Sequence, residues 1–239
     1  MSPTPYYDRD GISIYCGDCL EVMPQLDVTV DCIITDPPYG INFKYNEYID
    51  SPLGYSEFMQ EFLFLAKAKA VNEAPFFVWQ AMKNAPNWHE WFPHRFRIFA
   101  ACKAFSQFLP TPIQYSWDPV IFWGEIPNSP SCYSRDYSEQ RTTQFGAGRE
   151  KISPPCPRPL QQVAYIVSMA CNAGALVLDP FLGSGTTLLA AQNEGLRAIG
   201  IEISEEYCKV AVDRLRQPSF FSITTNEVPK NERSQAKLI

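Results

Sequence analysis

The segment Asp36-Pro37-Pro38-Tyr39-Gly40 directly follows a short apolar run that reads as a strand. Ligands of open parallel sheets bind beyond the carboxyl ends of the strands. Prolines have no backbone N–H, so the polar groups here are acceptors, namely the Asp36 carboxylate and the carbonyls of Pro37 and Pro38. Two acceptors that hold the hydrogens of a nucleobase amine favour a pyramidal nitrogen whose lone pair can point at a methyl donor. Tyr39 offers a flat face for stacking a base. A rigid turn is the alternative interpretation.

A glycine-rich segment, residues 179–187, follows the apolar run ALVL and opens a helix. Gly183 and Gly185 permit a tight turn and a close backbone approach to a ligand, and the start of the helix offers free N–H groups. A third glycine at the dinucleotide spacing would fall at Leu188. The segment is therefore not the pyrophosphate-binding loop of a dinucleotide fold.

Glu202 ends the next apolar segment, RAIGIE, where an acidic side chain can accept hydrogen bonds from ribose hydroxyls. A ligand with a ribose, no pyrophosphate and an amino-acid end that can use a carboxylate such as Asp179 is S-adenosylmethionine. The glycine-rich segment and Glu202 together indicate this cofactor. The alternative is a simple strand-to-helix turn, with Glu202 as an acid at a helix N-terminus.

Two parts of the chain alternate strands and helices and must position these residues. Residues 12–80 read as strand, strand, helix and strand, and residues 160–215 read as helix, strand, helix, strand and helix. Such alternation predicts a parallel sheet covered by helices. With 239 residues, we expect one α/β domain over residues 1–239, with a doubly wound, mostly parallel, Rossmann-like sheet. The tail at residues 217–239 is expected to be loose.

These residues resemble the amino-group DNA methyltransferases, which modify adenine N6 or cytosine N4. The resemblance rests on DPPYG, on DPFLGSGTT, on IGIE ending at Glu202 and on GDCLEVM at residues 17–23. Because DPPYG precedes the glycine-rich segment, the order looks like that of the circularly permuted beta class. The resemblance implies a methyltransferase fold that uses S-adenosylmethionine.

The resemblance also implies roles for single residues. Asp36 and the Pro37 carbonyl would hold the target amine, and Tyr39 would stack on the flipped base. Residues 154–159 resemble the family's H-P-x-x-K-P segment, with Arg158 where Lys is frequent, and the role of Arg158 stays open. The implied cofactor contacts are Asp18 at the adenine, Glu202 at the ribose, and Phe181, Gly183, Ser184, Gly185 and Thr186 around the methionine part. Further cofactor-binding candidates are Cys19, Asp36 and Asp179.

Residues 80–158 match the family only loosely, and we expect them to form a small target-recognition insertion. They hold nine Lys and Arg against six Asp and Glu, whereas the rest of the chain has a net charge of −9. This difference leaves the middle of the chain most tolerant of an anionic partner. The candidate DNA contacts are Arg135, Arg141, Arg149 and Lys151. An ordinary solvated loop is the alternative.

The composition excludes several classes of protein. Hydrophobic residues make up 46% and charged residues 19%, and no apolar run approaches a membrane span, so disordered, collagenous and transmembrane classes are out. The eight cysteines are scattered without an export signal, so we expect reduced thiols and a cytoplasmic protein, bacterial or phage-encoded. Cys16 and Cys19 form a lone C-x-x-C, so no metal site is expected.

The sequence thus predicts methyl transfer from S-adenosylmethionine to adenine N6 of a flipped base in double-stranded DNA. Adenine is preferred because Asp leads the acceptor motif, where Ser is more frequent in cytosine-N4 enzymes. The alternatives are a cytosine-N4 enzyme, a methyltransferase of RNA or protein amines, and an inactive DNA-binding module. We expect no membrane partner, and homodimer formation and the presence of a restriction partner stay open.

Overall fold

The computed structural model describes residues 3–42, 50–103, 116–127, 137–139 and 158–217. The first part of the chain forms β1 (Tyr7–Arg9), β2 (Ile12–Cys16), α1 (Cys19–Gln25), β3 (Cys32–Thr35), α2 (Tyr55–Lys69) and β4 (Phe76–Trp79). The middle forms the 3-10 helix η1 (Met82–Asn87), α3 (Trp88–Trp91), β5 (Arg97–Cys102), β6 (Trp117–Trp123) and β7 (Tyr137–Glu139). The last part forms α4 (Leu160–Ala170), β8 (Leu176–Asp179), α5 (Thr186–Asn193), β9 (Arg197–Glu202) and α6 (Glu205–Arg216).

The described strands form one sheet in the order β1-β2-β9-β8-β3-β4-β6-β5-β7. The neighbours from β2 to β4 run parallel, whereas β1 and β6 pair antiparallel with β2 and β4. The strand β7 lies in the predicted target-recognition insertion, and it pairs with β5. Three residues are too few to display an alternating pattern, so only the pairing with β5 reveals this strand.

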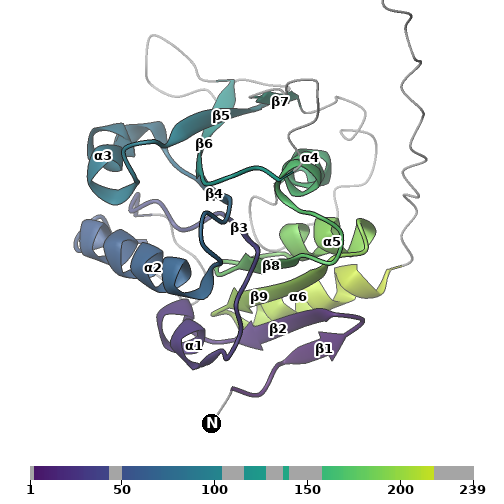
Figure 1. Cartoon of the computed structure of the whole chain (residues 1–239). Coiled ribbons are helices and arrows are strands. Elements are labelled where there is room, and N and C mark those ends of the chain that lie inside the picture. Colours follow the sequence, from purple (N-terminus) through teal and green to yellow (C-terminus); the bar gives the residue numbers. More distant parts are fainter. Residues whose placement is uncertain (1–2, 43–49, 104–115, 128–136, 140–157, 218–239) are drawn as a thin grey trace, which may run out of the picture.

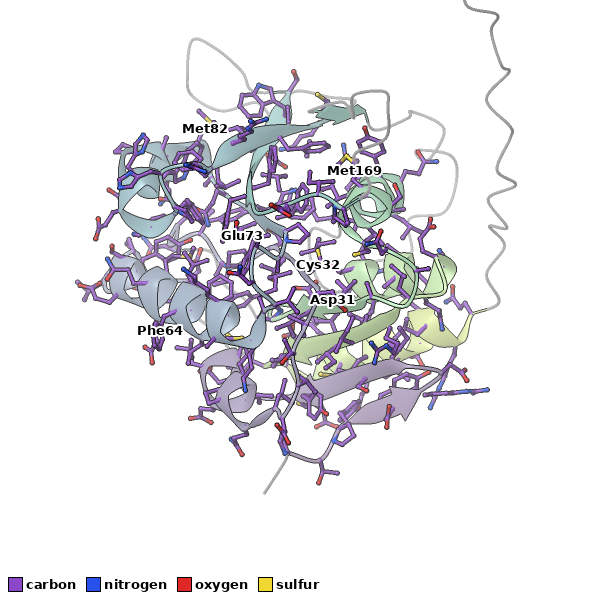
Figure 2. The ribbon with its side chains drawn as sticks, in the orientation of Figure 1. Asp31, Cys32, Phe64, Glu73, Met82 and Met169 are labelled. Carbon is purple, nitrogen blue, oxygen red and sulfur yellow. The ribbon has the colours of Figure 1, made fainter. Side chains whose placement is uncertain are left out.

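Helices cover both faces of the sheet, which confirms the doubly wound α/β prediction (Figure 1). Helices α1, α2 and α3 lie on one face, and α4, α5 and α6 lie on the other. Successive strand residues alternate between the two hydrophobic cores, so that Ile33 packs with α1 and α2 while Ile34 packs with α4 and α5. Figure 2 shows Phe64 on the outer side of α2, away from the sheet, and this side chain is 73% exposed.

The chain reverses its winding direction between β8 and β3. From β8 it passes through α5 to β9 on one side of the sheet, and from β3 it passes through α2 to β4 on the other. Ligands of open α/β sheets bind at such a switch point, beyond the carboxyl ends of the strands. The strands that end at this edge of the sheet deliver Asp18, Asp36, Gln80, Asp179 and Glu202 to it.

Two further strands bring charged residues to the same edge. Because β6 runs antiparallel to β4, its first residues, including Asp118, lie beside the carboxyl end of β4. The backbone N–H of Gln80 donates to the Pro119 carbonyl at 3.0 Å, which fixes this relation. Strand β5 runs antiparallel to β6 and ends at Cys102, so Lys103 reaches the edge as well.

Candidate active site

Asp179 and Thr35 meet across the switch point. The Thr35 hydroxyl donates to Asp179 Oδ1 at 2.7 Å, and the backbone N–H of Phe181 donates to the same oxygen at 3.1 Å. Burial raises the pKa of Asp179 to about 6, although hydrogen bonds from Thr187, Thr35 and the Phe181 N–H oppose the shift. This carboxyl therefore titrates close to neutral pH, at the place where the glycine-rich loop begins.

The glycine-rich loop has a backbone shape that requires glycine. Gly183 and Gly185 have φ angles of +53° and +81°, in the left-handed region. A Cβ atom on Gly185 would also lie only 2.8 Å from the Cβ of Ala211 in α6. The loop therefore packs closely against α6 and β9, as the sequence interpretation of a tight turn predicts.

Glu202 fastens this loop to β9. One carboxylate oxygen accepts a hydrogen bond from the Gly183 N–H at 2.7 Å, and the other accepts one from the Ser204 N–H at 2.9 Å. A carboxylate has about four acceptor positions, so these bonds are compatible with a ribose hydroxyl as a further donor. Glu202 thus has a structural role that the sequence interpretation as a ribose ligand does not include.

Arg214 of α6 holds the other side of the loop, and sequence reasoning missed it. Its Nη1 donates to the Ser184 carbonyl at 2.6 Å, to Ser184 Oγ at 2.8 Å and to Thr186 Oγ1 at 3.1 Å. Both residues are buried, and both hydroxyls accept a hydrogen bond from Arg214. No described residue accepts a hydrogen bond from the backbone N–H of Ser184 or Thr186, and these two donors fit an anionic group such as a carboxylate.

Three other cofactor-binding candidates have structural duties. The ring of Phe181 packs edge-on against Phe58 and Phe62 of α2, at centroid distances of 5.8 and 5.0 Å. Asp18 caps α1 by accepting a hydrogen bond from the Leu20 N–H at 2.8 Å. Cys19 is buried in the core, and burial together with Asp18 raises the pKa of its thiol. The Cys19 side chain is therefore part of the hydrophobic core on the α1 and α2 face of the sheet.

The acceptor loop at residues 36–40 is fixed by side chains of α2 and η1. Asp50 is fully buried, and its carboxylate accepts hydrogen bonds from the Gly40 and Ile41 N–H groups. Three successive loop carbonyls accept a hydrogen bond each, Pro38 from the Tyr55 hydroxyl at 2.8 Å, Tyr39 from Asn84 Nδ2 at 3.0 Å and Gly40 from Lys83 Nζ at 2.7 Å.

The Pro37 carbonyl differs from the three that follow it. Within the described part of the chain, no residue donates a hydrogen bond to the Pro37 oxygen. The sequence predicts both proline carbonyls as acceptors for an amine, but the Pro38 oxygen already accepts from Tyr55. Of the two proline carbonyls, the geometry therefore favours that of Pro37 as the acceptor for the amine. Pro37 directly follows Asp36 in the chain.

Arg158 contacts both oxygens of the Asp36 carboxylate. Its Nε lies 2.6 Å from Oδ2, and its Nη2 lies 3.1 Å from Oδ1. Nη2 also donates to the Tyr39 hydroxyl, which in turn donates to Asp36. Burial is the main cause that raises the pKa of Tyr39, so this phenol stays protonated. The sequence leaves the role of Arg158 open, and the structure brings it to the acceptor motif.

A second carboxylate completes a line of alternating charges. Asp118 accepts hydrogen bonds from Arg158 Nη1 at 2.6 Å and from Lys103 Nζ at 2.7 Å. The guanidinium of Arg158 also lies 5.7 Å from the centre of the Trp79 ring. Burial disfavours the charged guanidinium, but Asp36, Tyr39 and Asp118 together outweigh burial, and the pKa of Arg158 lies above its usual range. Arg158 is therefore a permanent cation.

The candidate DNA contacts Arg135, Arg141, Arg149 and Lys151 lie outside the described residues. Most of the tail at residues 217–239 lies outside them as well. Within the described ranges, no three His, Cys, Asp or Glu side chains are grouped so that they can hold a metal ion. The described helices include none that is long and apolar enough to span a membrane.

Comparisons with known proteins agree with this geometry. A family model described as DNA methylase matches residues 112–213. The Type II methyltransferase M.ScaI of Streptomyces caespitosus is 24% identical over 88% of this chain and 83% of its own length. The crystal structure of the M1.HpyAVI-SAM complex has a TM-score of 0.63 and 24% identity, and the match covers 86% of this chain and all of that one.

The cytosine-N4-specific PvuII DNA methyltransferase has the same fold. Its structure matches with a TM-score of 0.69 at 18% identity, over 92% of this chain and 91% of that one. The doubly wound sheet is thus the fold of the S-adenosylmethionine-dependent DNA methyltransferases. The chain is thus similar in sequence and in fold to DNA methylases of the N6/N4 family.

Proposed function

We propose that this protein transfers a methyl group from S-adenosylmethionine to the N6 amine of adenine in double-stranded DNA. The observation that carries the proposal is the meeting of two acceptors, the Asp36 carboxylate and the Pro37 carbonyl, with the glycine-rich loop at one switch point. The two acceptors can each bind one hydrogen of an amine, and the loop can bind the methyl donor.

The residues of the loop fit S-adenosylmethionine. This cofactor supplies an electrophilic methyl group on a sulfonium centre. The backbone N–H groups of Ser184 and Thr186 suit its carboxylate, Asp179 suits its ammonium group, and Glu202 suits its ribose hydroxyls. Asp18 follows β2, which pairs with β9, and suits the adenine of the cofactor.

Asp36 and Pro37 prepare the amine for attack. When the carboxylate and the carbonyl each accept one N–H, the nitrogen becomes pyramidal and its lone pair is no longer conjugated with the base. The nitrogen would then gain the methyl group as the bond between this carbon and the sulfonium sulfur breaks, which leaves a neutral thioether. The nitrogen would also lose one proton, for which Asp36 is the adjacent base. The amine of a paired base is inaccessible, so the base must leave the duplex, and the Tyr39 ring would stack on it.

The choice of adenine rests on the first residue of the motif, which is Asp36. Cytosine N4 also presents two hydrogens to the same acceptors, so a cytosine-N4 enzyme is the second candidate. The proposal further includes the permuted motif order, because β3 with the acceptor motif precedes β8 with the cofactor loop. It also includes residues 80–158 as the target-recognition region. The DNA contacts proposed in this region are Arg135, Arg141, Arg149 and Lys151. The proposed location is the cytoplasm of a bacterial host.

The test is to incubate the protein with methyl-labelled S-adenosylmethionine and unmethylated duplex DNA, and to identify the labelled nucleoside after digestion. Label on N6-methyladenine supports the proposal, and label on N4-methylcytosine keeps the mechanism but changes the base. Absence of label on DNA overturns the proposal and directs the search to RNA or protein amines. The exposed Asp27 provides a matched control, because the variant Asp27→Ala should label DNA as the wild type does.

A further inference from the structure

The acceptor site of the DNA-free protein already holds a donor from its own chain. Arg158 donates from Nε to Asp36 Oδ2 at 2.6 Å and from Nη2 to Oδ1 at 3.1 Å, and Nη2 also donates to the Tyr39 hydroxyl. These are charge-assisted hydrogen bonds, the stronger kind. A nucleobase amine needs the same carboxylate. Because Oδ1 accepts from both Tyr39 and Arg158 and Oδ2 faces Arg158 Nε, the amine has to compete with the guanidinium for Asp36.

The guanidinium resembles the group that it would exclude. It is planar and carries N–H donors at its edge, as the amine edge of adenine and cytosine does. It also lies over an aromatic ring, 5.7 Å from the centre of Trp79. We infer that Arg158 occupies the place of the target amine in the DNA-free protein and withdraws from Asp36 when the flipped base enters. This inference rests on the proposed function.

Asp118 provides the place to which Arg158 can withdraw. Arg158 Nη1 donates to Asp118 Oδ2 at 2.6 Å, on the side of the guanidinium away from Asp36. This contact can persist as a pivot while Nε and Nη2 leave Asp36. Lys103 also contacts Asp118, at 2.7 Å, so the carboxylate that receives Arg158 is already held in position. The arginine therefore keeps a counter-ion in both states.

The binding of Arg158 to Asp36 in the DNA-free protein has a measurable consequence. A base that must displace Arg158 binds with an affinity reduced by the fraction of molecules whose site is free. Removing Arg158 should therefore lower KM for DNA, by about tenfold, while kcat changes little. If Arg158 instead remained on Asp36 and oriented it during transfer, its removal would lower kcat and leave KM almost unchanged.

The experiment compares wild-type protein, Arg158→Ala and Arg158→Lys in steady-state methylation of unmethylated duplex DNA. The control is Arg9→Ala, because Arg9 is exposed in β1, an outermost strand of the sheet, and lies outside the proposed target-recognition region. Each reaction is repeated with guanidinium chloride at about 20 mM, far below denaturing concentrations, and with sodium chloride at equal ionic strength. Thermal melts show that each variant folds and whether guanidinium binds it.

The small cation should fill the space left in Arg158→Ala and raise the melting temperature of that variant only. Under the inference, Arg158→Ala has a lower KM for DNA, and guanidinium inhibits it in competition with DNA without inhibiting the wild type. An inactive Arg158→Ala whose turnover guanidinium restores would overturn the inference, and so would an unchanged KM. Failure of the proposed function looks different, because then neither the wild type nor any variant labels DNA.

Discussion

The hydroxyl of Thr35 donates a hydrogen bond to the carboxylate of Asp179 at 2.7 Å. Thr35 is the last residue of β3 and directly precedes Asp36, and Asp179 is the last residue of β8 and begins the glycine-rich loop. This contact joins the two strands on either side of the switch point. The acceptor loop and the cofactor loop are therefore held in one fixed relation.

Thr35→Val should weaken this connection without changing the shape of the side chain. The valine leaves one acceptor of the buried Asp179 without its donor, and we expect a loss of about 1–3 kcal/mol in the free energy of unfolding. Loss of the hydrogen bond from Thr35 should also raise the pKa of Asp179 further, since this hydrogen bond opposes the effect of burial. Urea unfolding measures the first effect. Thr35→Ser retains the hydroxyl and should recover most of the stability, and equal losses in both variants would contradict the role of the hydrogen bond.

Asp179→Asn should change how stability depends on pH. The pKa of Asp179 is about 6 in the folded protein, above the value of about 3.9 for an unfolded chain. The folded state thus binds this proton more tightly, so the contribution of Asp179 to stability is complete below about pH 4 and is lost as the pH rises through 6. A shift of about two units corresponds to roughly 3 kcal/mol.

The measurement is urea unfolding of wild type and Asp179→Asn at a series of pH values. The unfolding free energy of the variant relative to that of the wild type should increase by roughly 2 kcal/mol from pH 4 to about pH 6. Asp27→Asn, at an exposed position, should show no such trend. A difference that stays constant over this range would exclude a raised pKa at Asp179.

Arg214→Ala should weaken cofactor binding through the glycine-rich loop. The arginine holds Ser184 and Thr186 by three hydrogen bonds, and burial lowers its own pKa. Without it, the two free backbone N–H groups lose their fixed direction, and we expect the Kd for S-adenosylmethionine to rise about tenfold. Calorimetry measures the Kd. Arg216→Ala is the matched control, because Arg216 is exposed two residues further along the same helix and stacks on Tyr7. An equal Kd in both variants would remove the positioning role of Arg214.

The sequence predicts the local parts of the site well. Asp36, Asp179 and Glu202 each follow or end a run of apolar residues, and such runs identify buried strands. The glycines at 183 and 185 also reveal their turn, because their spacing and the helix after them are local features. The carboxyl ends of parallel strands share one edge, so these predictions are enough to bring the main residues together.

The sequence does not predict contacts that depend on tertiary packing. Arg158 is 122 residues from Asp36, and Arg214 is 30 residues from Ser184, and no pattern relates either pair. Phe181 follows Asp179 in the loop, but its ring turns into the core because α2 crosses below it. The buried Asp50 shows the same limit, since its role appears only when residues 40 and 41 fold back over it.

The central claim is that Asp36 holds the target amine, so that its removal abolishes methyl transfer while cofactor binding largely survives. The most direct measurement is single-turnover methylation of duplex DNA by Asp36→Ala, together with the Kd of this variant for S-adenosylmethionine. The account predicts that the transfer rate falls by about a thousandfold or more while the Kd stays within about threefold of the wild-type value. Transfer at the wild-type rate would contradict the account, and so would a lost rate that is fully explained by lost cofactor binding.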